Sequence, residues 1–364
     1  MVVVGAGIIG CAVAYELARR GARVQVIDRR EVGQGATQAS AGVLAPYLEA
    51  HERPLVELGA RSLALYDEFV AGVVEDSGAA VQYVRSGTLE VADGAASFAR
   101  LQAKGRAYGA AGVPVEVLAG AALREAEPRL AEHIAGGLLV HPHGFVGATD
   151  LAGALQRAAA AHGVTFVTAT AVARVSRQGG ELSVETGGDV IACERVVLAA
   201  GSWTGQVEVD GGETIPVRPV RGQLLHLGWP ARTLSRVVWA AHCYLVPWTD
   251  GTVLAGATIE DVGFEERVTV TGVRQLLEMA QAIIPGVGEA WFREARVGLR
   301  PATPDELPVV GPSTRLPGLV YATGHYRNGI LLAPLTAALV ADLVLDGKDD
   351  PALEIMVPSR FGDS

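Results

Sequence analysis

The residues best suited to chemistry near the start of the chain are three glycines and one aspartate. Gly5, Gly7 and Gly10 form a Gly-x-Gly-x-x-Gly pattern, and Asp28 follows Gly10 by 18 positions. The first glycine permits a tight turn, the second lets the backbone approach a pyrophosphate, and the third lets a helix pack against a strand. A carboxylate at the position of Asp28 accepts hydrogen bonds from ribose hydroxyls and disfavours a 2′-phosphate. The pattern therefore predicts dinucleotide binding, with a glycine-rich turn that serves only packing as the alternative.

The elements that must position these residues have the required order. A β-branched run at 1–4 precedes the glycines, a helical pattern at 11–20 follows them, and 23–27 is typical of a second strand. The helix would direct amide groups and the positive end of its dipole at the phosphates. The turn alone leaves NAD and FAD open. The loop at 33–42 is rich in small and hydroxyl residues, which suits a chain wrapped around a longer cofactor and equally suits a flexible loop.

Composition excludes several classes of protein. The 364 residues favour two domains, and 49% hydrophobic residues exclude wholesale disorder. A net charge of −10 argues against nucleic-acid partners. Three scattered cysteines match neither a disulfide framework nor a zinc-ligand spacing, so we expect a reducing cytoplasm. The apolar stretch 329–345 is interrupted by Pro334, Thr336 and Asp342, which predicts a buried helix and no membrane span.

Along the rest of the chain, α/β segments at both ends and in the middle enclose two mostly antiparallel blocks. The apolar run 195–201 predicts a central parallel strand whose end meets the first glycine turn. Thr149 or Asp150 is expected to cap a helix over 151–162. The interleaving predicts an α/β protein with a discontinuous, Rossmann-like cofactor domain and a substrate domain of mainly antiparallel sheet inserted into it. The cofactor domain is expected at 1–80, 141–210 and 295–364, and the substrate domain at 81–140 and 211–294.

Three separated motifs carry a resemblance to a known family. They are 324–334 (GHYRNGILLAP), 298–301 (GLRP) and the loop 35–42. Together they are similar to the FAD-dependent amine oxidases of the D-amino acid oxidase family, and within it to glycine oxidases of thiamine biosynthesis. The resemblance covers nearly the whole chain, from Val2 to about Leu345. It implies noncovalent FAD and a p-hydroxybenzoate-hydroxylase-like arrangement of the FAD and substrate domains.

The resemblance also implies the site residues. Arg300 and Tyr244 match the pair that holds a substrate carboxylate, and Arg327 matches a second arginine over the active site. The cofactor would contact residues of the glycine turn, of the loop that follows the second strand, of a later strand and of the C-terminal motif: Gly5, Gly7, Ile8, Ile9, Gly10, Asp28, Arg29, Ala36, Thr37, Ala41, Gly42, Val43, Val172, Gly324, His325, Tyr326, Arg327, Asn328, Gly329, Ile330 and Leu331. The helix after Asn328 would direct amides at the flavin N1 and C2 oxygen.

The reaction that the resemblance implies is hydride transfer from the α-carbon of a small amino acid or amine to flavin N5. An imine forms, and O2 reoxidises the flavin to give hydrogen peroxide. The imine would hydrolyse to glyoxylate and ammonia or feed the thiazole synthase machinery. Two alternatives stay open: a D-amino acid or sarcosine-type dehydrogenase that passes electrons to a quinone, and a flavoprotein without turnover. An assembly of identical chains also stays open.

Some residues depart from the family pattern or have ordinary explanations. Ile259 stands where one glycine oxidase pattern has methionine, and Tyr326 stands where phenylalanine is common, which puts strict glycine preference in doubt. The chain has no cysteine after Cys243, which excludes the C-terminal flavin tether of monomeric sarcosine oxidases. Arg218 and Arg221 are expected to be surface or interdomain charges, with substrate guidance as the less favoured alternative.

The histidines predict no metal site. His141 and His143 lack a third ligand, so a role in a turn is preferred over metal binding. His242 and Cys243 are neighbours that would point to opposite faces of a strand, which makes a shared metal improbable. Cys11 is expected to be a small packing residue in the first helix.

Overall fold

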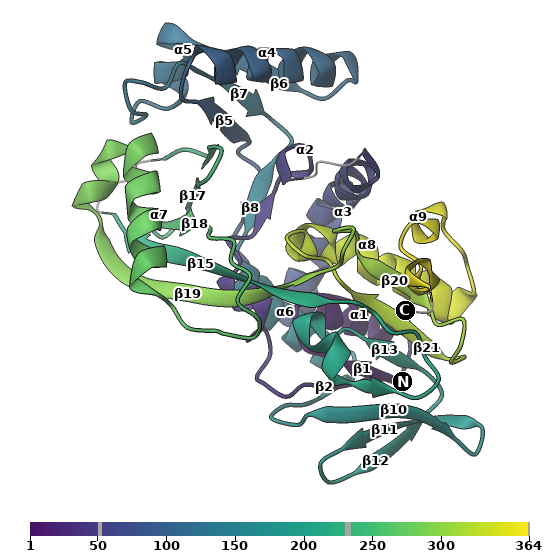
Figure 1. Cartoon of the computed structure of the whole chain (residues 1–364). Helices are drawn as coiled ribbons and strands as arrows, with labels where there is room; N and C mark the ends of the chain where they lie inside the picture. Colours follow the sequence, from purple (N-terminus) through teal and green to yellow (C-terminus); the bar gives the residue numbers. More distant parts are fainter. Residues whose placement is uncertain (50–52, 230–233, 363–364) are drawn as a thin grey trace.

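The computed structural model describes residues 1–49, 53–229 and 234–362. A six-stranded sheet in the order β20-β21-β13-β1-β2-β9 forms the centre of the half that the sequence predicts to bind the cofactor (Figure 1). Its strands are β1 (Val2–Val4), β2 (Gln25–Ile27), β9 (Thr165–Val167), β13 (Val196–Leu198), β20 (Val309–Pro312) and β21 (Leu319–Thr323). Every pairing in it is parallel except that of β20 with β21. Parallel strands are covered on both faces, which explains why β1 and β13 are continuous apolar runs.

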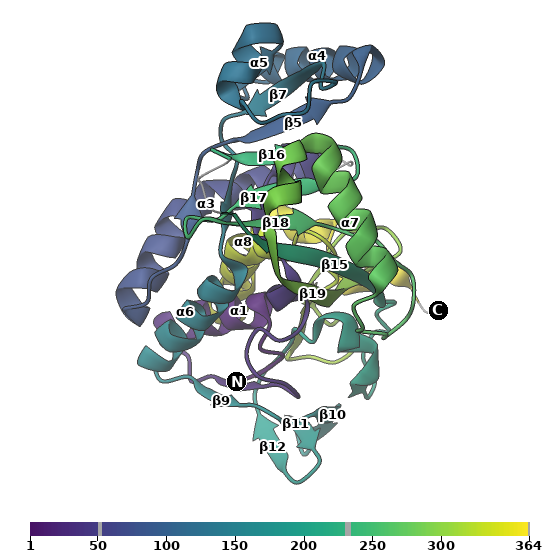
Figure 2. The same ribbon diagram turned by 90° about the vertical axis from the view of Figure 1, so that its left-hand side faces the viewer.

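Helices cover one face of this sheet, and a small sheet covers the other. The helices are α1 (Ile8–Arg19), α3 (Arg53–Ser77), α6 (Ala148–Ala161) and α8 (Gly329–Ala341), and α1 packs against both α6 and α8 (Figure 2). The small sheet contains β10 (Val172–Gln178), β11 (Glu181–Thr186), β12 (Val190–Cys193) and β14 (Glu208–Val209). Val3 packs in the helical core, whereas Val2 and Val4 pack against the small sheet. The alternation of side chains along β1 therefore joins two cores.

The last long helix lies in the protein core, as predicted. Among the described residues, one window, Gly329–Asp346, is long and apolar enough to cross a bilayer, and 67% of it is buried inside the protein. It comprises α8 and the π-helical turn η4 (Asp342–Asp346). A helix that is apolar all round its circumference is expected when neighbours surround it.

The other half, which the sequence predicts to be the substrate-binding half, is built on an eight-stranded sheet in the order β19-β15-β18-β17-β16-β5-β7-β6. Its strands are β5 (Thr88–Ala92), β6 (Val115–Leu118), β7 (Gly136–Val140), β15 (Arg218–Gly228), β16 (Val237–Trp239), β17 (Tyr244–Pro247), β18 (Thr252–Gly256) and β19 (Trp291–Ala302). Helix α7 (Val270–Ile283) packs against β15 and β18. Helices α4 (Ala95–Ala110) and α5 (Gly120–Ala126) lie beyond β5 and β7, at the opposite end of the molecule from β10–β12 (Figure 1).

Short elements complete the chain. A three-stranded sheet joins β3 (Val43–Leu44), β8 (Gly144–Val146) and β4 (Tyr83–Val84). The remaining helical pieces are α2 (Pro46–Glu49), η1 (Ala36–Ala39), η2 (Gly201–Gln206), η3 (Pro285–Glu289), α9 (Pro351–Glu354) and η5 (Pro358–Phe361).

The structure confirms one sequence prediction about the glycine turn and corrects another about a helix start. Strand β13 pairs with β1 in parallel, and the amide of Ala199 donates to the carbonyl of Val4, so the end of β13 meets the glycine turn as predicted. The predicted cap of α6 is wrong. The helix begins at Ala148 after Gly147, without a side-chain cap, and Asp150 lies inside its first turn. An acid there still complements the positive end of the helix dipole.

The domain boundaries stay a prediction, and one strand crosses them. Strand β19 continues through the predicted boundary between 294 and 295 and pairs with β15 along its whole length. Position 300 therefore lies on the sheet of the substrate-binding half.

Candidate active site

The glycine turn is shaped by close backbone contacts. Gly5 has a φ of +112°, and a Cβ there would lie 2.3 Å from the carbonyl oxygen of Ala199. A Cβ on Gly10 would lie 1.8 Å from the carbonyl oxygen of Gly5. At Gly7 a Cβ would meet only Oγ1 of Thr37, at 3.7 Å. The fold therefore requires glycine at positions 5 and 10. At position 7 a side chain would fit the fold but would project into the cavity in front of the turn.

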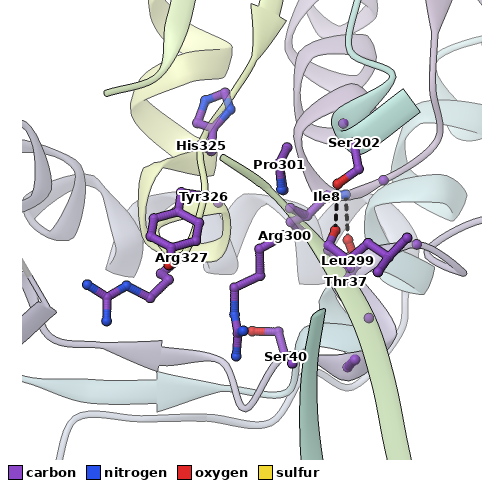
Figure 3. Close-up of a pocket in the computed structure, with 18 of the residues that line it drawn as sticks. Ile8, Thr37, Ser40, Ser202, Leu299, Arg300, Pro301, His325, Tyr326 and Arg327 are labelled. Atoms are coloured by element: carbon purple, nitrogen blue, oxygen red, sulfur yellow. Dashed lines mark hydrogen bonds between the residues drawn. The ribbon is translucent and has the colours of Figure 1, made fainter. Parts of the chain in front are cut away.

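Asp28 and Thr37 organise the edge of this cavity. The Asp28 carboxylate accepts hydrogen bonds from the amides of Ala6 (2.6 Å) and Arg30 (2.8 Å). Oγ1 of Thr37 accepts a hydrogen bond of 3.0 Å from the amide of Ile8, the first residue of α1 (Figure 3). This hydrogen bond attaches the loop that contains η1 to the start of α1. The first amides of a helix have no partner within the helix, and Thr37 provides one for Ile8.

A single cavity of about 870 Å³ joins the glycine turn to the substrate-binding sheet. The predicted residues on its wall are Gly5, Gly7, Ile8, Ile9, Asp28, Arg29, Ala36, Thr37, Ala41, Gly42, Val43, Val172, Tyr244, Arg300, His325, Tyr326, Arg327, Gly329 and Ile330. Four other predicted residues are not on the wall: Gly10, Gly324, Asn328 and Leu331. Asn328 and Leu331 are buried behind it.

The loop over 35–43 is held between two strands. Gly42 has a φ of +68°, and a Cβ there would lie 1.7 Å from the carbonyl oxygen of Val146. On the other side, a Cβ on Gly298 of β19 would approach Ala39 Cβ to 2.8 Å and Ala36 Cα to 3.2 Å. The glycine in the Gly-Leu-Arg-Pro motif therefore lets β19 approach η1, which brings Arg300 to the cavity.

Arg300 has its guanidinium group over a glycine. A Cβ on Gly222, on the neighbouring strand β15, would lie 2.3 Å from both Nη atoms of Arg300. Nη1 of Arg300 donates to the carbonyl oxygen of Thr258 (3.0 Å) and, more weakly, to that of Arg221 (3.4 Å). Neutral carbonyls leave the positive charge of the guanidinium uncompensated, so it remains available for an anion.

Tyr244 is placed by its neighbours on the sheet. Its ring stacks on Trp239, with ring centroids 4.9 Å apart and planes at 22°. Tyr244 pairs with Gly256 across β17 and β18, and a Cβ on Gly256 would lie 2.9 Å from the phenol oxygen. The absence of a side chain at position 256 makes room for the ring.

The turn before α8 forms another wall. Tyr326 has a φ of +47°, a conformation that costs energy for a residue with a side chain and that is concentrated at functional sites. Its amide donates to the carbonyl oxygen of Pro301 (2.9 Å), which links the turn to β19. The His325 ring points away from Tyr326 (Figure 3), and its Nε2 lies 3.0 Å from Oγ1 of Thr336. Burial lowers the pKa of His325 to about 3, so its ring is neutral at physiological pH.

Two buried polar atoms in this turn have no hydrogen-bond partner among the described residues. They are Nε of Arg327 and Oδ1 of Asn328. Asn328 precedes the first turn of α8 but does not cap it with its side chain. A donor and an acceptor at a helix N-terminus suit a ligand with both kinds of group.

Several cavity residues were not predicted. Trp203 on η2, Trp239 and Thr258 lie on the wall, as do His242, Gln275 and Met279. Trp203 follows the small residues at the end of β13 and lies under the guanidinium of Arg30, 4.3 Å from the ring centroid. The small residues after an apolar strand are the one local signal for Trp203. The other residues come from β16, from the turn after it, from the segment after β18 and from α7, and no single motif joins them. The two departures, Ile259 and Tyr326, both line the cavity.

The remaining predictions, those for Arg218, Arg221 and the histidines, have different outcomes. Arg218 is an exposed residue that pairs with Asp261, as expected, but Arg221 is 5% exposed and is neither a surface charge nor on the cavity wall. His141 and His143 lie at the turn between β7 and β8. No group of three histidine, cysteine or acidic side chains that suits a metal ion occurs in the part of the chain that the structure describes.

Comparison with known proteins decides the family. A profile described as FAD dependent oxidoreductase, of the DAO type, matches residues 1–343. The chain belongs to this FAD-dependent oxidoreductase family. It is 36% identical to a glycine oxidase of Geobacillus kaustophilus over 94% of this chain and 92% of that protein. The crystal structure of glycine oxidase from that organism matches with a TM-score of 0.94 and 35% identity, over 99% of this chain and 98% of the other.

A second relative of this FAD-dependent oxidoreductase is longer. A bifunctional protein ThiO/ThiG of Nostoc is 37% identical over 99% of this chain, which spans 55% of that protein. The family and these relatives show that the chain is an FAD-dependent oxidoreductase related to amine oxidases. Its fold is therefore the predicted α/β fold with an FAD-binding part.

The residues of the cavity fit FAD. Gly7, the start of α1 and Asp28 offer a phosphate and ribose site. At the N-terminus of α8, Arg327 on the wall and Asn328 behind it have unpartnered polar atoms, a donor and an acceptor, and the edge of a flavin ring has groups of both kinds. The wall of the cavity extends from the glycine turn after β1 to residues of β17 and β19, which suits an extended dinucleotide with a small substrate beyond it.

Proposed function

We propose that this chain oxidises glycine or a similar small amino acid or N-methylated amine, and that Arg300 holds the substrate carboxylate. One observation carries the proposal. Among the described residues of the cavity wall, the substrate end has Arg300 and Arg327 and no carboxylate, whereas the nucleotide end has Arg29 and Arg30 beside the single carboxylate, Asp28. A cavity charged in this way attracts an anion to the substrate end.

The side chains have separate tasks in this proposal. The Arg300 fork binds the carboxylate through two parallel hydrogen bonds, and the Tyr244 hydroxyl adds a neutral donor. Arg327 supplies a second positive charge. The apolar wall, including Ile259 and Met279, reduces the access of water. Together these residues fix the direction of the substrate α-carbon, because two anchored carboxylate oxygens leave little rotational freedom.

When bound, FAD supplies the acceptor for a hydride from the α-carbon. Glycine would lose two electrons and two hydrogens to give its imine, and O2 would take them up as hydrogen peroxide. Water added to the imine would yield glyoxylate and ammonia. The similarity to glycine oxidases supports this substrate class.

The product has a second proposed use. The similarity to bifunctional ThiO/ThiG proteins supports delivery of the imine to thiazole synthase for thiamine formation. Three free cysteines support a reducing cytoplasm as the compartment. If delivery occurs, adding thiazole synthase will lower the glyoxylate released per peroxide formed, whereas an unchanged ratio would contradict delivery.

The test of the main proposal is anaerobic reduction of the bound flavin by a panel of glycine, sarcosine, D-alanine and methylamine. We expect bleaching by the three amino acids and little by methylamine, which lacks a carboxylate. Bleaching by none of the amino acids would contradict the substrate class. A parallel assay compares O2 with an artificial quinone acceptor, and a rate that depends on the quinone would identify a dehydrogenase.

A further inference from the structure

An ion pair between the buried Arg221 and the partly exposed Glu260 lies next to Arg300, at one end of the cavity. Nη2 of Arg221, on β15, is 2.5 Å from Oε2 of Glu260, and Nη1 donates weakly to the carbonyl of Glu265 (3.4 Å). The main chains of Arg221 and Glu260 also exchange two hydrogen bonds of 2.9 Å. This double attachment fixes the segment after β18 against the middle of β15.

The second oxygen of Glu260 is a hydrogen-bond hub. Oε1 accepts from Oγ1 of Thr258 (2.5 Å) and from Nε2 of Gln223 (2.7 Å). Oγ1 of Thr258 accepts in turn from the amide of Gln223 (2.9 Å), and the Gln223 side chain is fully buried. Burial would raise the pKa of Glu260, but the hydrogen bonds from Arg221, Thr258 and Gln223 lower it below its usual value. The hub is therefore an ionised acceptor.

The network also reaches helix α7. The amide of Thr269 donates to Oε1 of Gln223 (2.8 Å), and Oγ1 of Thr269 accepts from Nε2 of Gln223 (3.1 Å). Oγ1 of Thr269 also accepts from the amide of Gly272 and so caps α7. The segment 258–269 is thus attached at both ends to one buried glutamine.

This network ends at the guanidinium of Arg300. The two carbonyls that accept from Nη1 of Arg300 belong to Thr258 and Arg221, which are two of the three residues whose side chains donate to Glu260. Buried ion pairs contribute little net stability compared with apolar packing, because desolvation offsets their attraction. A role in positioning the guanidinium of Arg300 would explain why Arg221 and Glu260 are paired here.

We propose that Glu260, through Thr258 and Arg221, is a positioning residue that fixes the direction of the Arg300 guanidinium for the substrate carboxylate. This inference rests on the proposed function, in which Arg300 binds that carboxylate. It adds that the affinity for a carboxylate depends on a residue that touches neither substrate nor cofactor.

The experiment compares Glu260→Gln with Asp261→Asn in the FAD-loaded protein. Asp261 is the next residue and loses the same charge, but it is exposed and pairs only with Arg218 in the described structure. The readouts are the Kd of acetate, from the change in flavin absorption, the KM and kcat for glycine, and bound FAD per chain. We expect Glu260→Gln to raise the acetate Kd and the KM about tenfold, with kcat changed less and FAD content unchanged. Asp261→Asn should match the wild type.

A second pair isolates the hydroxyl of Thr258. Thr258→Val removes it at nearly constant shape and is expected to raise the KM about fivefold, whereas Thr258→Ser restores it and should recover most of the affinity. In an Arg300→Ala background, Glu260→Gln should add no further loss in kcat/KM, because the effect passes through Arg300.

The outcomes separate the two proposals. If the wild type neither binds acetate nor is reduced by amino acids, the proposed function is wrong. If it does both, and Glu260→Gln behaves as Asp261→Asn does, the positioning role is wrong. An equal loss of FAD and acetate binding in Glu260→Gln, additive losses with Arg300→Ala, or a loss of folding in both Glu260→Gln and Thr258→Val would also overturn it, since each indicates a general structural role.

Discussion

The two ends of the cavity are built in different ways. At the nucleotide end the shape comes from backbone in contact with backbone, as where a Cβ on Gly10 would meet the Gly5 carbonyl at 1.8 Å. At the substrate end it comes from long side chains held by hydrogen bonds across strands, as where Arg300 lies over Gly222 and donates to Thr258. The first end tolerates no added atom where backbone touches backbone, at Gly5 and Gly10, whereas the second can change its charges without changing the fold. Substrate choice can therefore vary while the cofactor stays the same.

The largest effect is expected from Gly10→Ala. The new Cβ would meet backbone that cannot move without separating α1 from β1, so we expect about 3 kcal/mol or more of lost stability and little soluble protein. Thermal unfolding of the flavin-free protein measures this.

Gly7→Ala is the matched control at the same turn. Its Cβ fits, with its nearest contact at 3.7 Å, so the flavin-free fold should survive while the affinity for FAD falls at least about tenfold. Unchanged FAD affinity in Gly7→Ala would show that the pyrophosphate does not lie against this turn.

An intermediate effect is expected from Gly222→Ala, a glycine-to-alanine substitution at the substrate end of the cavity. In Gly222→Ala the Cβ meets the flexible tip of Arg300, which can move, so the fold and FAD content should be kept. The displaced guanidinium should raise the KM for glycine about tenfold or more. Gly153→Ala, in α6 with open space around it, is the control and should match the wild type. Loss of FAD from Gly222→Ala would break the distinction between the two ends.

The smallest effect is expected from Asp350→Asn, which removes a charge outside both ends of the cavity. Hydrogen bonds from Arg61 lower the pKa of Asp350 to about 2. Because the pKa in the folded protein is depressed, this stabilisation is present above about pH 4 and disappears as the pH falls toward 2. Asp350→Asn keeps an acceptor for the amide of Ala352 and should cost less than about 1 kcal/mol at pH 7.

Urea unfolding of the flavin-free protein at pH 7 and at pH 3 measures that difference, which should shrink at the lower pH while glycine turnover at pH 7 stays as in the wild type. A stability difference that grows on acidification would contradict the assignment.

The same contrast explains what could be predicted. The nucleotide end was predictable because its strand, glycines, helix and aspartate are contiguous within 28 residues. The meeting of β13 with Gly5 followed from one apolar run that ends in small residues. Arg300 and Tyr244 came from the resemblance alone, and β19, which carries Arg300, was not predicted because its exposed first half mixes aromatic and charged residues.

The hub at Glu260 could not be predicted either. It depends on the register that places Arg221 opposite Glu260 and on the burial of Gln223, and neither leaves a local pattern in the sequence. Arg221 was expected to be a surface or interdomain charge, because a charged residue in an otherwise mixed strand gives no sign of a distant acidic partner. The environment of Arg221 depends on its pairing with Glu260, which is 39 positions away in the sequence.

The most direct test of the central claim is anaerobic stopped-flow reduction of the flavin by glycine in the wild type and in Arg300→Ala. Both proteins should hold equal FAD. The glycine concentration for half-maximal reduction should rise about tenfold to a hundredfold or more in the variant, because a charge-assisted pair is lost. An unchanged concentration, or a loss of FAD that accounts for the whole defect, would contradict the assignment of Arg300 as the carboxylate anchor.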